Sequence, residues 1–158
     1  MAQEVYTELY EVMKSRRGPY TGLEIPEFYA MVEKLFTPQE AEVNNVMTRK
    51  PATAAEIAGE MNREENEIKA ILETMADKGL CKTFLKDDLR LYQGEPFMPG
   101  IFEYQFMSGK DTDRHRNLAG LIKAYKKAFN AAKGELKMTF PITRVIPVDR
   151  TIEAGNTV

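Results

Sequence analysis

Cysteine and histidine are nearly missing from this 158-residue sequence, since Cys81 and His115 are the only residues of either type. One thiol cannot form an internal disulfide, and this pair is far short of the ligands that a structural zinc ion or an iron–sulfur cluster requires. The sequence therefore predicts no metal or cofactor site in this chain. So little cysteine also favours a reduced, cytoplasmic setting.

Long apolar runs, a signal sequence and a strongly basic composition are missing as well. No apolar run approaches the ~20 residues of a membrane span, and residues 1–5 do not look like a signal peptide. We expect no membrane association. The net charge of −2 weakens a nucleic-acid function. The scattered glycines form no phosphate-binding loop and no acid–base pair is evident, so we expect no enzymatic activity.

Capped helices are what the sequence does contain. Residues 37–40 (Thr-Pro-Gln-Glu) and 53–56 (Thr-Ala-Ala-Glu) are capping boxes, in which the threonine and the glutamate each satisfy a free backbone N–H. Asn62 is predicted to cap a further helix that ends at Gly79, a residue suited to the left-handed position after a helix. Three short helices in close succession are therefore expected between residues 37 and 79.

The apolar period changes to two after Gly79. Alternating residues from Leu80 to Leu85, a polar turn at 86–88 and a second run at 89–93 predict a β-hairpin. Three short helices followed by a hairpin are typical of a winged helix-turn-helix. The predicted fold is thus mainly α with a small β-hairpin wing, flanked by helical N- and C-terminal extensions.

These patterns divide the chain into four parts. Residues 1–36 form an N-terminal helical extension, and residues 37–93 form the winged helix-turn-helix. Residues 94–148 hold an aromatic segment, a long amphipathic helix and an edge strand that pack on the same domain. Residues 149–158 are expected to be a frayed tail or a linker.

DNA binding is the first function to test for a winged helix. The third helix of such a fold usually enters the major groove, yet here acidic residues outnumber basic ones on it. The residues that would contact phosphates are Arg49, Lys50, Lys82, Lys86 and Arg90. The segment 49–93 contains eight basic and nine acidic residues. The sequence therefore favours a solvated surface over a DNA-contacting one.

Other features allow alternative interpretations. The apolar stripe of the helix over 112–133 either packs on its own domain or forms the seam of a homodimer. The aromatic segment that follows the hairpin is expected to pack against the wing or the N-terminal helices. Its residues Phe97, Phe102, Tyr104 and Phe106 are an alternative small-molecule pocket. Cys81 is predicted to be a small buried hydrophobic residue.

Several segments resemble one protein family. They are residues 35–42 (LFTPQEAE), 75–80 (MADKGL), 96–105 (PFMPGIFEYQ), 144–148 (RVIPV) and 152–158 (IEAGNTV). Together they resemble the N-terminal winged-helix region of certain bacterial proteins that continue into a ferredoxin-type domain with two [4Fe–4S] clusters. The resemblance implies a non-catalytic accessory or protein-interaction module of a ferredoxin-like electron-transfer protein. Its expected partner is a redox protein or another copy of itself.

This sequence departs from that family in its cysteines. The cluster ligands of the family lie downstream, in runs of the C-x₂-C-x₂-C-x₃-C type, whereas Cys81 belongs to the predicted wing and matches no ligand. The two [4Fe–4S] clusters are therefore expected only in a downstream region, and we expect the chain to be a fragment; a natural relative without the redox part is the alternative. The alternative function is a DNA-binding transcriptional regulator.

Overall fold

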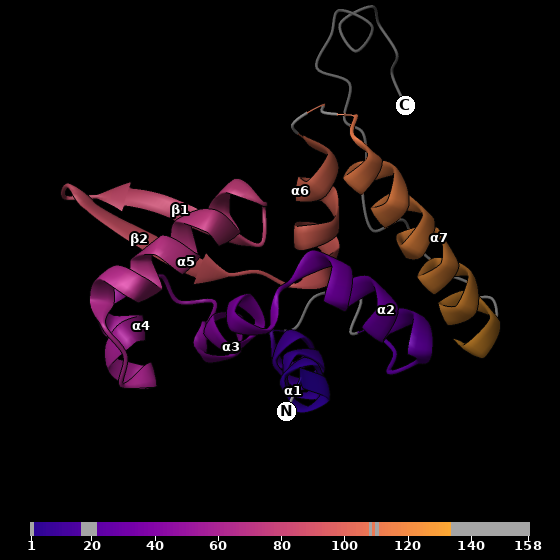
Figure 1. The fold of residues 1–158 in the computed structure, drawn as a ribbon, viewed down its shortest axis with the longest axis horizontal. Coiled ribbons are helices and arrows are strands. Elements are labelled where there is room, and N and C mark those ends of the chain that lie inside the picture. Colours follow the sequence, from indigo (N-terminus) through magenta and orange to yellow (C-terminus); the bar gives the residue numbers. More distant parts are fainter. Residues whose placement is uncertain (1, 17–21, 108, 110, 134–158) are drawn as a thin grey trace, which may run out of the picture.

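The computed structural model describes residues 2–16, 22–107, 109 and 111–133, and this part of the chain is mainly helical with one small antiparallel sheet (Figure 1). Its elements are α1 (Ala2–Ser15), α2 (Pro26–Leu35), α3 (Pro38–Val46), α4 (Ala54–Met61), α5 (Glu65–Asp77), β1 (Cys81–Lys86), β2 (Leu89–Gly94), the π-helical turn η1 (Phe97–Ile101), α6 (Phe102–Met107) and α7 (Asp113–Lys133). The strand predicted within 94–148, at residues 142–148, and the tail at 149–158 lie outside the described residues.

The starts of α3 and α4 follow the predicted capping chemistry. The Thr37 side chain accepts a hydrogen bond from the Glu40 backbone N–H (3.3 Å), and the Glu40 carboxylate accepts one from the Thr37 N–H (2.8 Å). Thr53 and Glu56 form the same box in front of α4. Both predictions are confirmed, because a capping box depends only on residues within one helical turn.

The predicted asparagine cap of the next helix is wrong. Asn62 ends α4 instead, in the left-handed conformation (φ 50°), with its N–H bonded back to the Gly59 carbonyl (3.2 Å). Helix α5 begins after Glu64 and has no side-chain cap. Asparagine adopts the left-handed conformation more readily than most residues, so it serves here to turn the chain between α4 and α5.

The hairpin forms as predicted, but its turn has two residues and not the three predicted at 86–88, because Lys86 belongs to β1 and pairs with Leu89. Asp87 and Asp88 both have positive φ (50° and 61°), which is the conformation of the type I′ turn that matches the twist of a hairpin. The strands pair from Cys81 opposite Gly94 to Lys86 opposite Leu89. Ala52, between α3 and α4, adds a short bridge to the outer edge of β2 at Tyr92.

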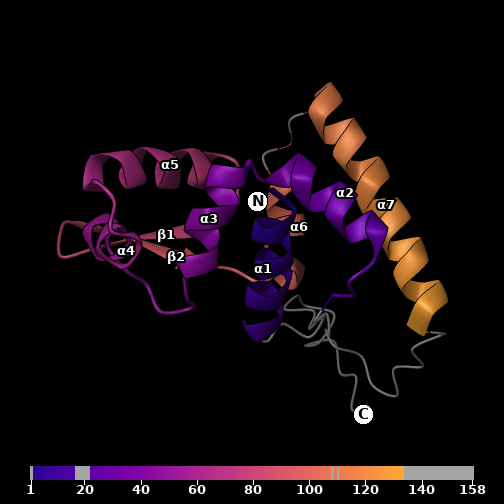
Figure 2. The same cartoon turned by 60° about the horizontal axis from the view of Figure 1, so that its bottom comes forward.

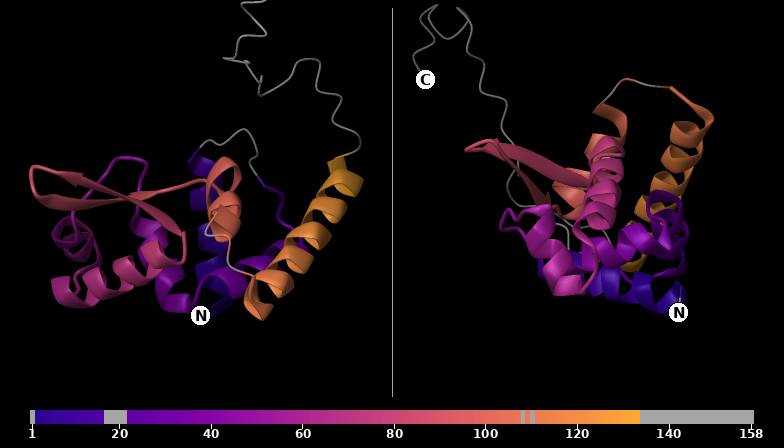
Figure 3. Two further views of the ribbon diagram at one scale, coloured as in Figure 1. Left: turned by 90° about the horizontal axis from the view of Figure 1, so that it is seen from above. Right: turned by 60° about the vertical axis from the view of Figure 1, so that its left-hand side comes forward.

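The elements are arranged as two ends and a middle. The hairpin, α4 and α5 lie at one end, α2 and α7 at the other, and α1 and α3 lie between them (Figures 1 and 2). The view from above shows the same separation of the hairpin from α7 (Figure 3). The apolar stripe of α7 packs along α2, and its buried residues are Leu118, Ile122, Tyr125 and Phe129. The stripe is therefore covered by its own chain; self-association through the helix over 112–133 stays a prediction.

Phe28 of α2 lies at the centre of an aromatic cluster. Its ring contacts those of Tyr10, Tyr29, Phe97 and Tyr125 edge-on, at centroid distances of 5.2, 5.5, 5.3 and 6.1 Å. The Phe97 contact confirms that the aromatic segment packs on an N-terminal helix. Edge-on aromatic pairs contribute beyond the area that they bury, so this cluster joins α1, α2, η1 and α7.

Arg16 follows α1 and is buried, although the sequence places it at a helix end followed by Arg17, Gly18 and Pro19. Its guanidinium donates to the carbonyls of Asn44 (2.5 Å) and Met47 (2.7 Å) and to the Asn44 side chain (2.7 Å). Burial lowers its pKa to about 10, so it is still charged at neutral pH. Arg16 thereby holds the end of α1 against α3 and the end of β2.

Candidate functional site

The basic residues that the sequence offered as DNA contacts differ in their surroundings in the structure. Lys50 and Lys86 are exposed. Arg49 donates to the carbonyl of Arg16 (3.2 Å), which ties it to the end of α1. Of these three cations, Lys50 and Lys86 are exposed and Arg49 is held by a backbone carbonyl.

The other two predicted contacts are paired with acidic residues. Lys82 lies 3.4 Å from a carboxylate oxygen of the buried Glu95 and sits over the Tyr104 ring. Arg90 forms an ion pair with Glu73 of α5, with an Nη2–Oε2 distance of 2.7 Å. Each pair reduces the positive charge that the hairpin presents to a phosphate backbone.

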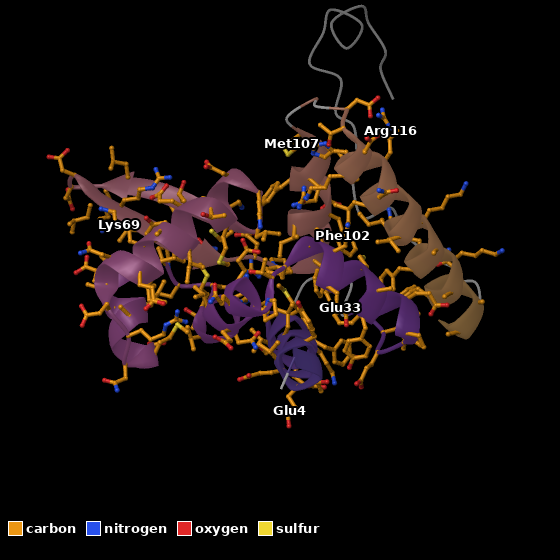
Figure 4. All side chains as sticks on the ribbon, in the orientation of Figure 1. Glu4, Glu33, Lys69, Phe102, Met107 and Arg116 are labelled. Atoms are coloured by element: carbon orange, nitrogen blue, oxygen red, sulfur yellow. The ribbon has the colours of Figure 1, made fainter. Side chains whose placement is uncertain are left out.

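The exposed surface of α5 is acidic. The helix carries one basic residue, Lys69, and its acidic residues are Glu65, Glu67, Glu73 and Asp77. Arg63, just before α5, forms ion pairs with Glu67 and with Glu42 of α3 (3.7 Å for the latter). Figure 4 shows where this helix lies: Lys69, its one basic residue, is at the opposite end of the molecule from Arg116 of the basic helix α7. This helix therefore presents negative charge, as its sequence predicts.

The hairpin carries apolar side chains on its surface. Phe84, Leu85 and Leu89 are 42, 74 and 58% exposed, and we call these three residues the hairpin tip. Phe84 is paired with Leu91, and Lys86 with Leu89, so all four side chains share one face of the two-stranded sheet. Leu85 lies on the other face, opposite Arg90. The alternating pattern of the sequence predicted the two strands but not the exposure of these apolar side chains. Alternation alone does not show which face of a hairpin is covered by other elements.

A second surface feature is a cavity at the other end of the molecule. Its volume is about 220 Å³, and its lining residues are Gly22, Phe97, Phe102, Tyr125, Lys126, Phe129 and Asn130. Phe102 lies at the start of α6, between that helix and α7 (Figure 4). Its ring stacks on Phe97 with a centroid distance of 5.4 Å. We call this space the aromatic cavity.

Only part of the pocket predicted from the sequence is present there. Phe97 and Phe102 line the aromatic cavity, but Tyr104 packs over Gly79 and under Lys82. Phe106 is 41% exposed and faces the His115 ring. The prediction was wrong for these two residues because Tyr104 projects from α6 toward Gly79 and Lys82, and Phe106 faces His115 near the start of α7. Tyr125 and Phe129 take their place, and their helical spacing of four residues was visible in the sequence.

Cys81 is a buried free thiol, 5% exposed, and burial raises its pKa to about 12. This confirms its predicted role as a small hydrophobic residue. Among the described residues, no three histidine, cysteine or acidic side chains gather as ligands for a metal ion. None of the helices in this part of the chain combines the length and the hydropathy needed to cross a membrane.

No protein-family model matches this sequence, and a search of curated protein sequences finds no match.

Proposed function

We propose that this chain is a non-catalytic protein-interaction module of a ferredoxin-like iron–sulfur electron-transfer protein, with residues 37–93 folded as a winged helix-turn-helix. The observation that carries the proposal is the exposed hairpin tip of Phe84, Leu85 and Leu89 beside an acidic helix. The element order α3, α4, α5, β1, β2 supports the winged-helix assignment. The segments that resemble the ferredoxin-type family support the link to electron transfer.

The charges of the helix-turn-helix favour a protein partner over DNA. A helix that enters the major groove approaches phosphates from both sides, and α5 would bring four carboxylates to them. The ion pairs of Arg63 and Arg90 with Glu67 and Glu73 place a carboxylate next to each arginine, which weakens its attraction for a phosphate. A DNA-binding transcriptional regulator is therefore the second choice.

The hairpin tip has the character of a contact surface. Protein interfaces concentrate aromatic and aliphatic side chains at their centre and polar groups at their rim. Phe84, Leu89 and Leu91 supply an apolar centre on one face, and Lys86 lies beside them. An arrangement of this kind fits a partner with an apolar contact patch and an acidic rim.

Crosslinking tests the contact surface. An amine-reactive crosslinker added to an anaerobic extract of the native host should join Lys86, beside the hairpin tip, to an iron–sulfur or flavin protein, as identified by mass spectrometry. The Leu85→Ser/Leu89→Ser variant should lose most of these crosslinks. Met107→Ser is the matched control, because Met107 is as exposed as Leu85 (74%) but lies on α6. Equal crosslinking by both variants would refute the assigned surface.

The link to electron transfer and the rival function each have a direct test. We expect the polypeptide purified from its native host without oxygen to exceed 18.0 kDa and to absorb broadly near roughly 400 nm, as thiolate-bound clusters do. A colourless polypeptide of 18.0 kDa would refute the electron-transfer assignment. Affinity for duplex DNA that falls steeply with salt would instead establish the regulator, and Lys86→Glu and Lys50→Glu should then weaken it.

A further inference from the structure

The aromatic cavity combines apolar walls with a few polar residues. The rings of Phe97, Phe102 and Phe129 form its walls, and Tyr125, Lys126 and Asn130 add a hydroxyl, an ammonium and an amide. Its volume of about 220 Å³ exceeds the ~150 Å³ that accommodates benzene in an apolar protein cavity. A single ring with a short polar extension therefore matches its size.

The Tyr125 hydroxyl is held in place with its proton available. Its oxygen accepts a hydrogen bond from the backbone N–H of Leu23 (2.9 Å), and among the described residues no group accepts the hydroxyl proton. The residue is only 6% exposed. Burial raises its pKa above the ordinary value, so at neutral pH it is a donor. A buried donor is costly where it lacks an acceptor, as this one does among the described residues, and an acceptor atom in the cavity would remove that cost.

The charge beside the cavity is positive. Asp113 is the only acidic residue of α7, and Lys123, Lys126 and Lys127 follow it on the same helix. No acidic side chain in the described part of the chain forms an ion pair with Lys126. The acceptor that this arrangement favours is therefore an anion.

We propose that the aromatic cavity binds a small aromatic carboxylate, with its ring against the phenylalanines and its carboxylate between the Tyr125 hydroxyl and the Lys126 ammonium. This site lies apart from the hairpin tip and is independent of the function proposed above. Apolar walls with a few convergent polar groups are typical of small-molecule sites. The ring supplies most of the affinity, and the charge selects the anion.

Titration calorimetry with 3-phenylpropanoate tests the proposal, with 3-phenylpropanol as the neutral probe of the same shape. We expect saturable binding of the acid at about 0.1–1 mM, in line with its few heavy atoms, and weaker binding of the alcohol. Lys126→Glu should weaken binding of the acid about tenfold and leave the alcohol unchanged. Lys127→Glu is the matched control, because it makes the same charge change on a neighbouring residue that does not line the cavity.

The position of the probe is tested by the ring resonances in a ¹³C NMR spectrum. Addition of the acid should shift the signals of Phe97, Phe102, Tyr125 and Phe129 and leave Phe84, at the hairpin tip, unchanged. Absence of saturable binding would overturn the proposal. So would equal losses of affinity in Lys126→Glu and Lys127→Glu, because attraction to the general charge of α7 would then explain the binding.

Discussion

At the scale of single residues, the Arg16 side chain occupies the space that a side chain at Gly94 would need. The guanidinium of Arg16 lies directly on the backbone of Gly94, where a Cβ atom would be only 2.6 Å from Arg16 Cζ. The same guanidinium satisfies the carbonyls of Asn44 and Met47. A buried charge is costly unless it is hydrogen-bonded; the two terminal nitrogens of Arg16 have partners, whereas its Nε has none among the described residues. The absence of a side chain at Gly94 leaves the space that the guanidinium occupies.

Gly94→Ala is therefore expected to lower the free energy of unfolding by about 1–3 kcal/mol, because the new methyl group forces the guanidinium out of position. Urea denaturation, followed by circular dichroism, measures the free energy of unfolding of the variant and of the wild type. Gly59→Ala is the control, because a Cβ at this exposed helical position would meet no described atom within 4 Å apart from the backbone of its own helix and its chain neighbours. It should stabilise the protein by about 0.5–1 kcal/mol. A Gly94→Ala variant as stable as the wild type would show that Arg16 moves aside freely.

At the scale of elements, one carboxylate joins β2 to α5. Glu73 of α5 accepts a hydrogen bond from the Tyr92 hydroxyl and forms an ion pair with Arg90. The Tyr92 bond, followed by the nearby Arg90, holds the pKa of the Glu73 carboxyl below its ordinary value. Burial, together with the Glu73 carboxylate, raises the pKa of Tyr92 to about 12. The hydrogen bond between Tyr92 and Glu73 thus fixes the hairpin to α5, and it stabilises both the neutral hydroxyl and the charged carboxylate.

This linkage predicts a loss of stability at alkaline pH. The Tyr92 pKa is raised in the folded state, so its contribution is complete below the ordinary tyrosine pKa of 10.0 and is lost as pH rises toward 12. Between pH 9 and 11, Tyr92→Phe should lose stability less steeply than the wild type, as followed by the urea midpoint. Thr83→Val is the control, because this cross-strand neighbour has no ionisable group and should give a pH-independent difference. Parallel profiles for Tyr92→Phe and the wild type would contradict the linkage.

At the scale of the whole molecule, the two ends are joined through a shared core. The aromatic cluster around Phe28 connects α1, α2, η1 and α7 at one end. Cys81 is the first residue of β1, where the chain passes from α5 into the hairpin at the other end. Arg16 and α3 lie between them and contact both. Small domains with one continuous core usually unfold in a single cooperative step.

Phe28→Leu should therefore lower the stability of both ends together. We expect a loss of about 1–2 kcal/mol, since a fully buried ring is replaced by a smaller side chain. The urea midpoints from circular dichroism and from the reaction of Cys81 with a thiol reagent should shift equally. Phe84→Leu makes the same change at an exposed position and should alter stability by less than about 0.5 kcal/mol. An unchanged Cys81 midpoint in Phe28→Leu would show that the two ends unfold separately.

The sequence by itself determined the features that depend on neighbouring residues. The capping boxes at Thr37 and Thr53, the glycine that follows α5 and the β-hairpin all form where the pattern indicates. The buried stripe of α7 follows from its helical period. Each of these depends on interactions within a few residues, which a single sequence displays directly. The local error at Asn62 arose because asparagine suits both ends of a helix.

Tertiary structure alone decided which distant side chains meet. Nothing near Arg16 in the sequence indicates its burial on Gly94, and nothing near Arg90 indicates that Glu73 neutralises it. The aromatic cavity likewise joins Phe97 and Phe102 to Tyr125 and Phe129 across more than twenty residues of chain. The physical reason is that a side-chain type fixes what a residue is able to bind, whereas the packing of helices fixes which partner is within reach.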